Sequence, residues 1–319
     1  MIEINNAPTK SIRDGYGEGL LKMAKASPQV VVLVADLAES TRVADVFSSR
    51  PAQFLECGIS EQNMLGVAAG LAMVGKIPFV NSFAVFNPGR NWDQLRVSVC
   101  YQNLNVKVVG HHAGFSAGKD GATHQALEDI ALTRVLPGLV VLSPCDFNEA
   151  SNCVVAAAKH QGPVYIRISK SSAPEITSKN EEFIIGRGEI MCEGKHLTLI
   201  TTGSLTVPAL AAVKDLKGEL SVEVVKLSTI KPLDEETILS SAKKTGRVLV
   251  VEDHQVLGGL GGAVAELLSE KLPVYVFRHG IFDCFGESGS EVELLRKFKL
   301  DTMGIKEKIR QVVKINYSL

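Results

Sequence analysis

The stretch VVVLVAD at residues 30–36 places a run of valine and leucine directly before an aspartate. A run without a polar face is typical of a strand that helices bury on both sides of a parallel sheet. Comparable runs follow along the first half of the chain: PFVNSF (78–83), VKVVGHH (106–112), LVVLSP (139–144) and VYIRI (164–168). Together these runs predict a mostly parallel sheet.

Segments with helical periodicity separate the runs. EQNMLGVAAGLAMVG (61–75) and ATHQALEDIALTRVL (122–136) repeat apolar residues at spacings of three and four, which favours helices packed on the sheet. Ligands of open α/β sheets bind beyond the carboxyl ends of the strands. The polar residues that follow the runs, at 36–40, 58–61, 83–86 and 111–124, are therefore the first candidates for a functional site.

A second α/β unit follows the first. Residues 171–195 are polar and contain Pro and Gly, which is typical of a linker that crosses the surface. A new series of apolar runs comes after them: LTLITTG (197–203), VEVVKL (222–227), RVLVVED (247–253) and PVYVF (273–277). We predict one domain at 1–172, a linker at 173–194 and a smaller α/β domain at 195–319.

Composition narrows the classes of function. Of the 319 residues 45% are hydrophobic and 22% are charged, and the net charge is −1, so no nucleic-acid partner is expected. No apolar run approaches the roughly 18 residues that span a bilayer, and the start lacks a signal-peptide core, so we expect a cytoplasmic protein without a membrane partner. Six scattered cysteines predict neither disulfides nor a zinc site, and no metal ligand is expected on this chain.

Five motifs follow one another along the chain: ADLAES (35–40), GISEQNM (58–64), SFAVF (82–86), HHAGFSAGKDGATHQALE (111–128) and VEDHQVLGGLGGAVAE (251–266). Over nearly the whole chain they resemble the second half of transketolases, and the length matches the C-terminal subunit of the split form. The resemblance implies a pyrimidine-binding domain for thiamine diphosphate, followed by a transketolase C-terminal domain that is mainly structural. It also implies transfer of a two-carbon ketol unit from a ketose or its phosphate to an aldose or its phosphate.

The resemblance assigns the cofactor-binding residues. In that family the glutamate of the Gly-Ile-x-Glu motif, here Glu61, bonds the aminopyrimidine and supports loss of a proton from the thiazolium ring. Phe83 and Phe86 correspond to the aromatic platform, and Asp36 and Leu37 to further cofactor contacts. Taken alone, Glu61 could simply complement a helix dipole and the two phenylalanines could be core residues. Gly89 stands where larger transketolases have a tyrosine, so one wall of the cofactor pocket is expected to differ from theirs.

The resemblance also assigns substrate contacts. Asp120 is expected to bond a hydroxyl of the donor sugar, and His124 is expected to act beside the reacting carbons as the second catalytic residue. An Asp-Gly pair is also a common turn, so this motif alone leaves both interpretations open. The residues expected to hold the phosphate of a sugar phosphate are Arg13, Ser40, His112 and Lys170. Lys170 stands where transketolases usually have arginine, so a compact ammonium group replaces a guanidinium that could bond phosphate through two N–H groups.

The chain lacks the other half of the expected cofactor site. No Gly-Asp-Gly, which marks the diphosphate and metal site in this superfamily, occurs in the 319 residues. We therefore expect Mg²⁺ and the diphosphate on a separate N-terminal transketolase subunit, in an α2β2 heterotetramer. Two enzymatic alternatives share the Gly-Ile-x-Glu-Gln motif: the beta subunit of a 2-oxo acid dehydrogenase and a deoxyxylulose-phosphate synthase. A third alternative is a non-catalytic scaffold subunit related to transketolase.

Overall fold

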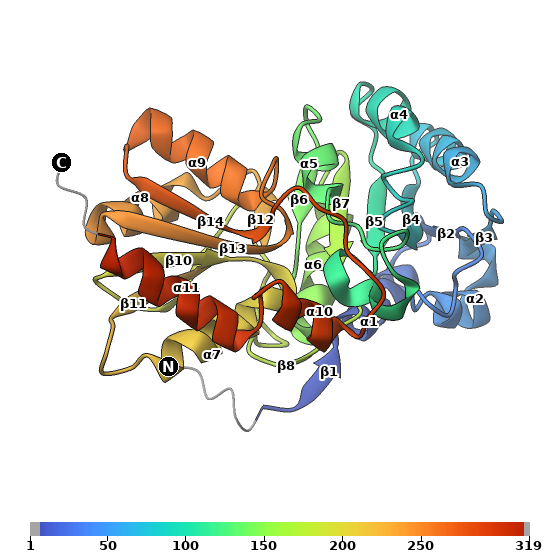
Figure 1. Ribbon diagram of the computed structural model, residues 1–319. Helices are drawn as coiled ribbons and strands as arrows, with labels where there is room; N and C mark the ends of the chain where they lie inside the picture. The colour runs from blue at the N-terminus through green and yellow to red at the C-terminus, as the bar shows by residue number, and fades with distance from the viewer. Residues whose placement is uncertain (1–6, 316–319) are drawn as a thin grey trace.

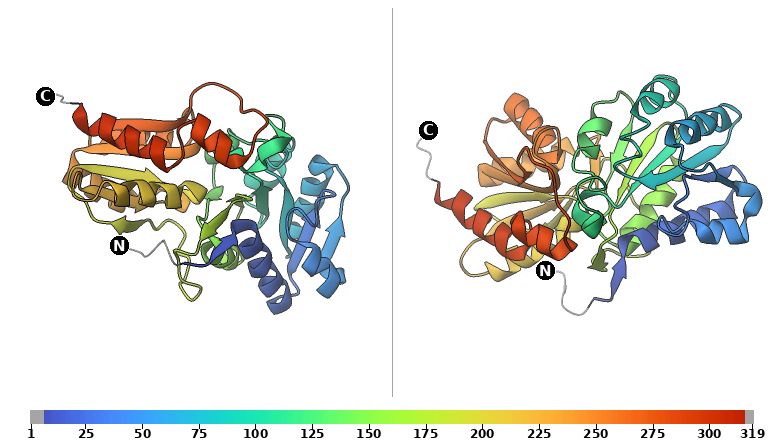
Figure 2. Two further views of the ribbon diagram at one scale, coloured as in Figure 1. Left: turned by 60° about the horizontal axis from the view of Figure 1, so that its bottom comes forward. Right: turned by 45° about the vertical axis from the view of Figure 1, so that its right-hand side comes forward.

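The computed structural model describes residues 7–315, so the ends of the predicted domains at 1–6 and 316–319 lie outside the described residues. Two α/β units lie side by side, each around its own sheet, with the C-terminal unit on the left and the N-terminal unit on the right of Figure 1. Figure 2 shows the same two layered units from two further directions. The predicted α/β fold class is confirmed.

The N-terminal sheet has seven strands in the order β12-β6-β7-β5-β4-β2-β3. Its members are β2 (Val30–Val34), β3 (Phe54–Glu56), β4 (Ile77–Phe83), β5 (Lys107–His111), β6 (Val140–Leu142), β7 (Val164–Ile168) and β12 (Thr229–Lys231). All neighbours pair in parallel except β12, which pairs antiparallel with β6. Every predicted apolar run of this half forms one of the strands.

The two faces of strand β2 explain its continuous apolar sequence. Val30, Val32 and Val34 pack into the core on one side of the sheet, and Val31 and Leu33 pack into the core on the other. Helices α1 (Ile12–Ala26) and α6 (Phe147–Lys159) cover the first face, and α3 (Glu61–Met73) covers the second. The shorter helices of this unit are α2 (Ala44–Ser49), α4 (Trp92–Gln94), which continues as a π-helical stretch over Leu95–Cys100, and α5 (Asp129–Arg134).

The C-terminal sheet has five strands in the order β14-β13-β10-β11-β9. They are β9 (Glu189–Cys192), β10 (Leu197–Thr201), β11 (Val222–Lys226), β13 (Arg247–Gln255) and β14 (Tyr275–Ile281), and only β9 runs antiparallel to its neighbour. Helices α7 (Thr206–Asp215) and α11 (Thr302–Lys314) cover one face, and α8 (Glu235–Thr245) and α9 (Leu260–Lys271) cover the other. The short helix α10 (Glu291–Lys297) lies against the N-terminal unit.

One strand of each sheet comes from outside its predicted domain. Strand β12 follows β11 in the chain but completes the N-terminal sheet, while β9 lies inside 173–194 and completes the C-terminal sheet. Strand β8 (Ser172–Pro174) begins just before that range and pairs with β1 (Thr9–Ser11). The domain limits at 1–172 and 195–319 stay a prediction, and the segment between them contributes strands to the structure.

One predicted helix is much shorter than its sequence pattern. Residues 122–136 repeat apolar side chains at helical spacing, but the helix α5 covers only Asp129–Arg134. The preceding residues form a turn in which the Gln125 side chain donates to the Gly118 carbonyl and the Gly114 N–H donates to the Ala126 carbonyl. No helix within residues 7–315 is both long enough and apolar enough to cross a membrane.

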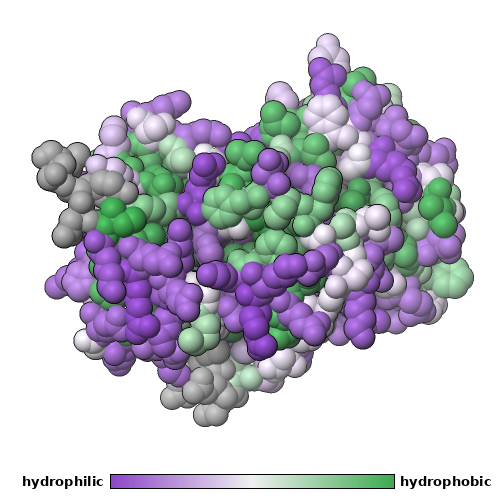
Figure 3. Space-filling model, in the orientation of Figure 1, coloured by the Kyte–Doolittle hydropathy of each residue, from purple (hydrophilic) through white to green (hydrophobic). Residues whose placement is uncertain are grey.

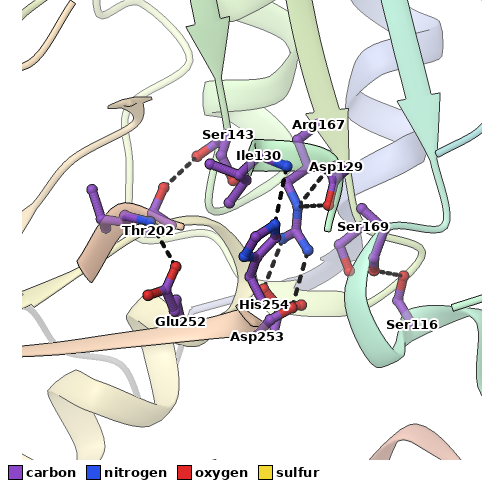
Figure 4. A network of polar contacts seen from close by, with 12 residues as sticks. Ser116, Asp129, Ile130, Ser143, Arg167, Ser169, Thr202, Glu252, Asp253 and His254 are labelled. Carbon is purple, nitrogen blue, oxygen red and sulfur yellow. Dashed lines mark hydrogen bonds and ion pairs between the residues drawn. The ribbon is translucent and has the colours of Figure 1, made fainter. Parts of the chain in front are cut away.

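A buried charge network joins the two units (Figure 4). Arg167 on β7 donates from Nε to the Asp129 carboxylate at 2.9 Å and from Nη1 to the Asp253 carboxylate on β13 at 2.7 Å. Tyr165 donates to the same Asp129 carboxylate at 2.8 Å. All three charged side chains are almost fully buried, and the two carboxylates raise the pKa of Arg167 against the opposing effect of burial.

Two neighbouring residues of the VEDH segment, His254 and Glu252, make further buried contacts with backbone N–H groups. Burial lowers the pKa of His254 to about 4, so its neutral ring donates from Nδ1 to the Gln255 carbonyl and accepts from the Ile130 N–H. Burial also raises the pKa of Glu252 to about 7, and its carboxyl accepts the N–H groups of Leu260 and Gly261 at the start of α9. Asp253 and His254 therefore fasten the C-terminal unit to the N-terminal unit, while Glu252 holds the start of α9 within the C-terminal unit.

We predict that Arg167→Met lowers the free energy of unfolding by about 3–5 kcal/mol, because it leaves two carboxylates buried without their cation. Urea unfolding followed by circular dichroism measures this effect. Arg310→Met is the matched control, since Arg310 pairs with Glu219 at the surface and its removal should change the midpoint little. Equal losses in the two variants would contradict the role of the buried network.

Candidate functional site

The predicted site residues gather at one edge of the N-terminal sheet. Strands β7, β5, β4, β2 and β3 are consecutive neighbours, and the chain order reverses between β2 and β4. Such a reversal is where open α/β sheets bind their ligands. The predicted site residues that end or follow these strands, or lie on the first turn of α1, are Arg13, Asp36, Leu37, Ser40, Glu61, Phe83, Phe86, His112, Asp120, His124 and Lys170.

Glu61 is the first residue of α3, and 1% of it is exposed. Ser60 stands at the N-cap position, but its hydroxyl donates to the Cys57 carbonyl instead of capping the helix. The Glu61 carboxylate accepts from the Ser82 hydroxyl at 3.3 Å and pairs with the Arg90 guanidinium at 2.8 Å. A charge buried this deeply needs such a partner, because desolvation without one is costly.

Arg90 is a site residue that sequence analysis missed. Its guanidinium carbon lies 4.4 Å from the centre of the Phe86 ring, so one side chain contacts both the acid and the aromatic platform. Its side chain is 46% exposed, which gives it room to move. At Gly89 an added side chain would overlap the Val85 carbonyl oxygen, so this turn does not accommodate the tyrosine of larger transketolases. The signal in the sequence was only an arginine directly after Gly89.

Four rings form a cluster beside Glu61. Phe83 stacks on His112 with ring centres 4.2 Å apart and lies 6.5 Å from Phe86 in a nearly parallel orientation. His124 meets Phe86 edge-on at 5.4 Å and Phe83 at 6.2 Å. The two phenylalanines come from one motif and the two histidines from another, and the four rings form one aromatic wall.

A cationic group lies on the other side of His112. Arg13 donates from Nη1 to the Ser40 carbonyl at 3.1 Å and to Nε2 of His112 at 3.3 Å. Burial, together with the charges of Lys170 and Arg13, lowers the pKa of His112 to about 3, so the ring is neutral. The Nε of Arg13 is buried without a hydrogen-bond partner among the described residues, which suits an anionic ligand. Arg42, a further cation near His112, is a contributor that the sequence analysis did not identify.

Three predicted residues are not hydrogen-bonded to this cluster within the described part of the chain. The Asp36 N–H donates to the Glu56 carboxylate, and the Leu37 carbonyl accepts from Thr41. Asp120 is exposed at the end of the turn η4 (Gly114–Asp120). Their positions at the same sheet edge are compatible with contacts to a bound ligand, and their roles stay a prediction.

The residues fit one half of the expected cofactor site. A buried carboxylate beside two partly stacked phenylalanine rings offers a hydrogen-bonding group and a flat apolar surface, as an aminopyrimidine requires. Within residues 7–315, no three His, Cys, Asp or Glu side chains gather as a set of metal ligands.

Comparison with known families gives matches over both units. Residues 9–175 match the pyrimidine-binding domain of transketolase, and residues 186–305 match the transketolase C-terminal domain. These two matches cover most of the chain and follow each other in the order that the motifs predicted.

Full-length relatives point in the same direction. A protein named as a transketolase C-terminal section from Methanocaldococcus jannaschii is 45% identical over 96% of this chain and 97% of its own length. The 6-deoxy-6-sulfo-D-fructose transketolase subunit SqwH of Clostridium sp. is 42% identical over 91% of this chain and 90% of its own length. A solved structure described as a split gene transketolase, inactive beta4 tetramer, matches with a TM-score of 0.89 and 43% identity over 96% of this chain and 99% of that one.

The motif-based interpretation is thereby confirmed: this chain belongs to the transketolase family and corresponds to the C-terminal subunit of a split, thiamine-diphosphate-dependent transketolase.

Proposed function

We propose that this chain supplies the pyrimidine-binding side of a ketol-transfer site and is active only in an α2β2 heterotetramer with an N-terminal subunit. That subunit would carry Mg²⁺ and the diphosphate of the cofactor. The observation that carries the proposal is the buried Glu61 carboxylate beside the aromatic cluster, at the open edge of the sheet. The lack of a Gly-Asp-Gly sequence also supports it, as does the relative whose structure is described as an inactive tetramer of one subunit.

When bound, thiamine diphosphate supplies the nucleophilic carbon and the electron sink. Glu61 would bond a ring nitrogen of the pyrimidine and hold the shared proton at a carboxyl oxygen. We expect the 2.8 Å pair with Arg90 to open when the cofactor binds, because the Arg90 guanidinium also lies over the Phe86 ring, where the pyrimidine would stack. Phe83 and Phe86 would flank the pyrimidine and exclude water, with Asp36 and Leu37 as further contacts at the end of β2.

His124 and Asp120 would bind the hydroxyl groups of the donor sugar. A buried donor or acceptor that is left unpaired by an analogue rejects that analogue strongly, so such contacts give specificity for hydroxylated substrates. His124 is half-buried, and its Nδ1 lies 3.0 Å from the Thr123 hydroxyl, which orients the ring. Its edge-on contact with Phe86 supports a position next to the rings that would flank the pyrimidine.

The cationic group would hold the phosphate of a sugar phosphate. Arg13 and Lys170 supply charge, and the neutral His112 supplies a hydrogen bond rather than charge. Ser40 contributes its backbone carbonyl to Arg13 in this structure, so its part in the site is to position that guanidinium, with its hydroxyl as a further donor. The cytoplasmic location expected from the sequence stays a prediction.

Glu61→Ala in the reconstituted two-subunit enzyme should lower kcat at least about a hundredfold, because a positioned proton-transfer group is removed. Steady-state ketol transfer from a ketose phosphate to an aldose phosphate measures the effect. Glu219→Gln, at the surface of the C-terminal unit, is the control and should keep full activity.

Two further assays separate a split transketolase from the alternative functions. The isolated chain, given thiamine diphosphate and Mg²⁺, should not turn over, and robust activity without the N-terminal subunit would refute the split site. The reconstituted enzyme should be nearly inert towards pyruvate, in contrast to a 2-oxo acid dehydrogenase or a deoxyxylulose-phosphate synthase. Full activity of Glu61→Ala would favour the scaffold interpretation.

Lys170→Met should raise the KM for a phosphorylated acceptor roughly tenfold, because one charge-assisted contact to phosphate is lost. Lys170→Arg should lower that KM, because a guanidinium can bond phosphate with two parallel N–H groups. The KM for the same acceptor without its phosphate is the internal control and should not change. A shift of both KM values together would place Lys170 outside the phosphate site.

A further inference from the structure

The segment that carries Asp120 and His124 connects β5 to α5 and consists of the 3-10 helix η4 followed by a loop. The Gly114 N–H donates to the Ala126 carbonyl at 2.9 Å, which closes the base of the loop. The His124 N–H donates to the Gly121 carbonyl at 3.0 Å within it. Gly118 and Gly121 have positive φ angles, so the chain turns sharply on either side of Asp120.

One side chain ties this loop to the C-terminal unit. The buried amide of Gln125 donates from Nε2 to the Gly118 carbonyl at 3.0 Å and to the Glu287 carbonyl at 2.9 Å. Gly118 belongs to the loop itself, whereas Glu287 lies between β14 and α10. Gln125 directly follows His124, so these two bonds hold the chain next to the histidine.

The C-terminal segment approaches the loop closely. An added Cβ at Gly286 would overlap the Gln125 amide oxygen and lie 3.1 Å from the Phe115 ring. An added Cβ at Gly121 would lie 2.7 Å from the Ser288 hydroxyl. Because the φ of Gly286 is not positive, its constraint is one of packing, and an added side chain would displace the end of the Gln125 side chain.

The C-terminal segment is itself held at both ends. Gln255 donates to the Cys284 carbonyl at 2.7 Å and accepts from the Asp283 N–H at 3.1 Å. At the other end, Ser290 forms a capping box that starts α10. Phe282 and Phe285 of this segment are exposed. Figure 3 shows apolar side chains gathered near the centre of the face of the molecule that Figure 1 presents.

We propose that Gln125 and segment 286–288 of the C-terminal unit form an inter-domain clasp that positions His124 and Asp120 against the donor sugar. Gln125 and Gly286 are positioning residues, since they act through the loop. The inference rests on the proposed function of His124 and Asp120, and it gives the C-terminal unit a part in the reaction beyond support of the fold.

Gln125→Glu tests the clasp, because it keeps the shape of the side chain and removes both N–H donors. In the reconstituted enzyme we expect kcat/KM for the ketose donor to fall at least about tenfold, with unchanged affinity for thiamine diphosphate. Hydrogen–deuterium exchange of residues 113–126 should rise, and this readout does not depend on activity. The unmodified complex is assayed first, so failure of the proposed function is recognised before the variants are compared.

Gln53→Glu is the matched control. The Gln53 amide also donates to two backbone carbonyls, those of Ser27 and Val30, but at a distance from the site. It should lower thermal stability about as much as Gln125→Glu and leave the kinetics for both substrates unchanged. The clasp is refuted if Gln125→Glu, like the control, lowers only the thermal stability. It is also refuted if hydrogen–deuterium exchange of the loop rises while kcat/KM for the ketose donor stays the same.

A double-mutant cycle tests the partner glycine. Gly286→Ala should lower kcat/KM in the native background by displacing the Gln125 amide, whereas in a Gln125→Ala background the added methyl group has space and should cost little. Equal effects of Gly286→Ala in the two backgrounds would contradict a clasp made through Gln125. The Gln125→Ala series also keeps the test open if Gln125→Glu fails to fold.

Discussion

A carboxylate that is almost completely withdrawn from water dominates the proposed site. Glu61 starts α3 below the open edge of the sheet, and in this chain Arg90 satisfies its charge while lying over Phe86. Because a buried charge without a partner is costly, the Glu61 carboxylate needs a hydrogen-bonding or charged partner both before and after a ligand binds. Arg90 thus pairs with the carboxylate and covers the Phe86 ring face that the cofactor would use. Its side chain is half-exposed, so it has room to move away when the cofactor binds.

The geometry of the remaining site depends on how firmly the two units are joined. Arg167 binds Asp129 at the start of α5 and Asp253 on β13, so the helix that ends the substrate loop is fixed to the C-terminal sheet. His254 accepts the Ile130 N–H in the same junction. The C-terminal segment near Gly286 is thereby held against the loop that carries His124. A domain without any proposed contact to the reacting atoms can in this way determine where a substrate-binding side chain stands.

Sequence patterns predicted the long apolar strands and the convergence of the motifs at one sheet edge, because a fully buried strand leaves a continuous local signature. The short strands β1, β3, β8, β9 and β12 left none, since each has only three or four residues and depends on pairing with distant segments. The apolar pattern at 122–136 predicted a helix that is too long, because the Gln125 side chain bonds the carbonyls of Gly118 and Glu287 and holds the residues before Asp129 in a loop. Arg90 lay between recognised motifs, and its contact with Glu61 depends on a fold that brings residues 61 and 90 together.

The most direct test of the central claim is a structure of the complex of both subunits with thiamine diphosphate and Mg²⁺. The account predicts a Glu61 carboxyl oxygen at about 3 Å from a ring nitrogen of the aminopyrimidine, which is hydrogen-bonding distance, with the Arg90 guanidinium displaced from the acid. A complex in which the Glu61 to Arg90 pair stays closed, with the pyrimidine bound elsewhere, would contradict it.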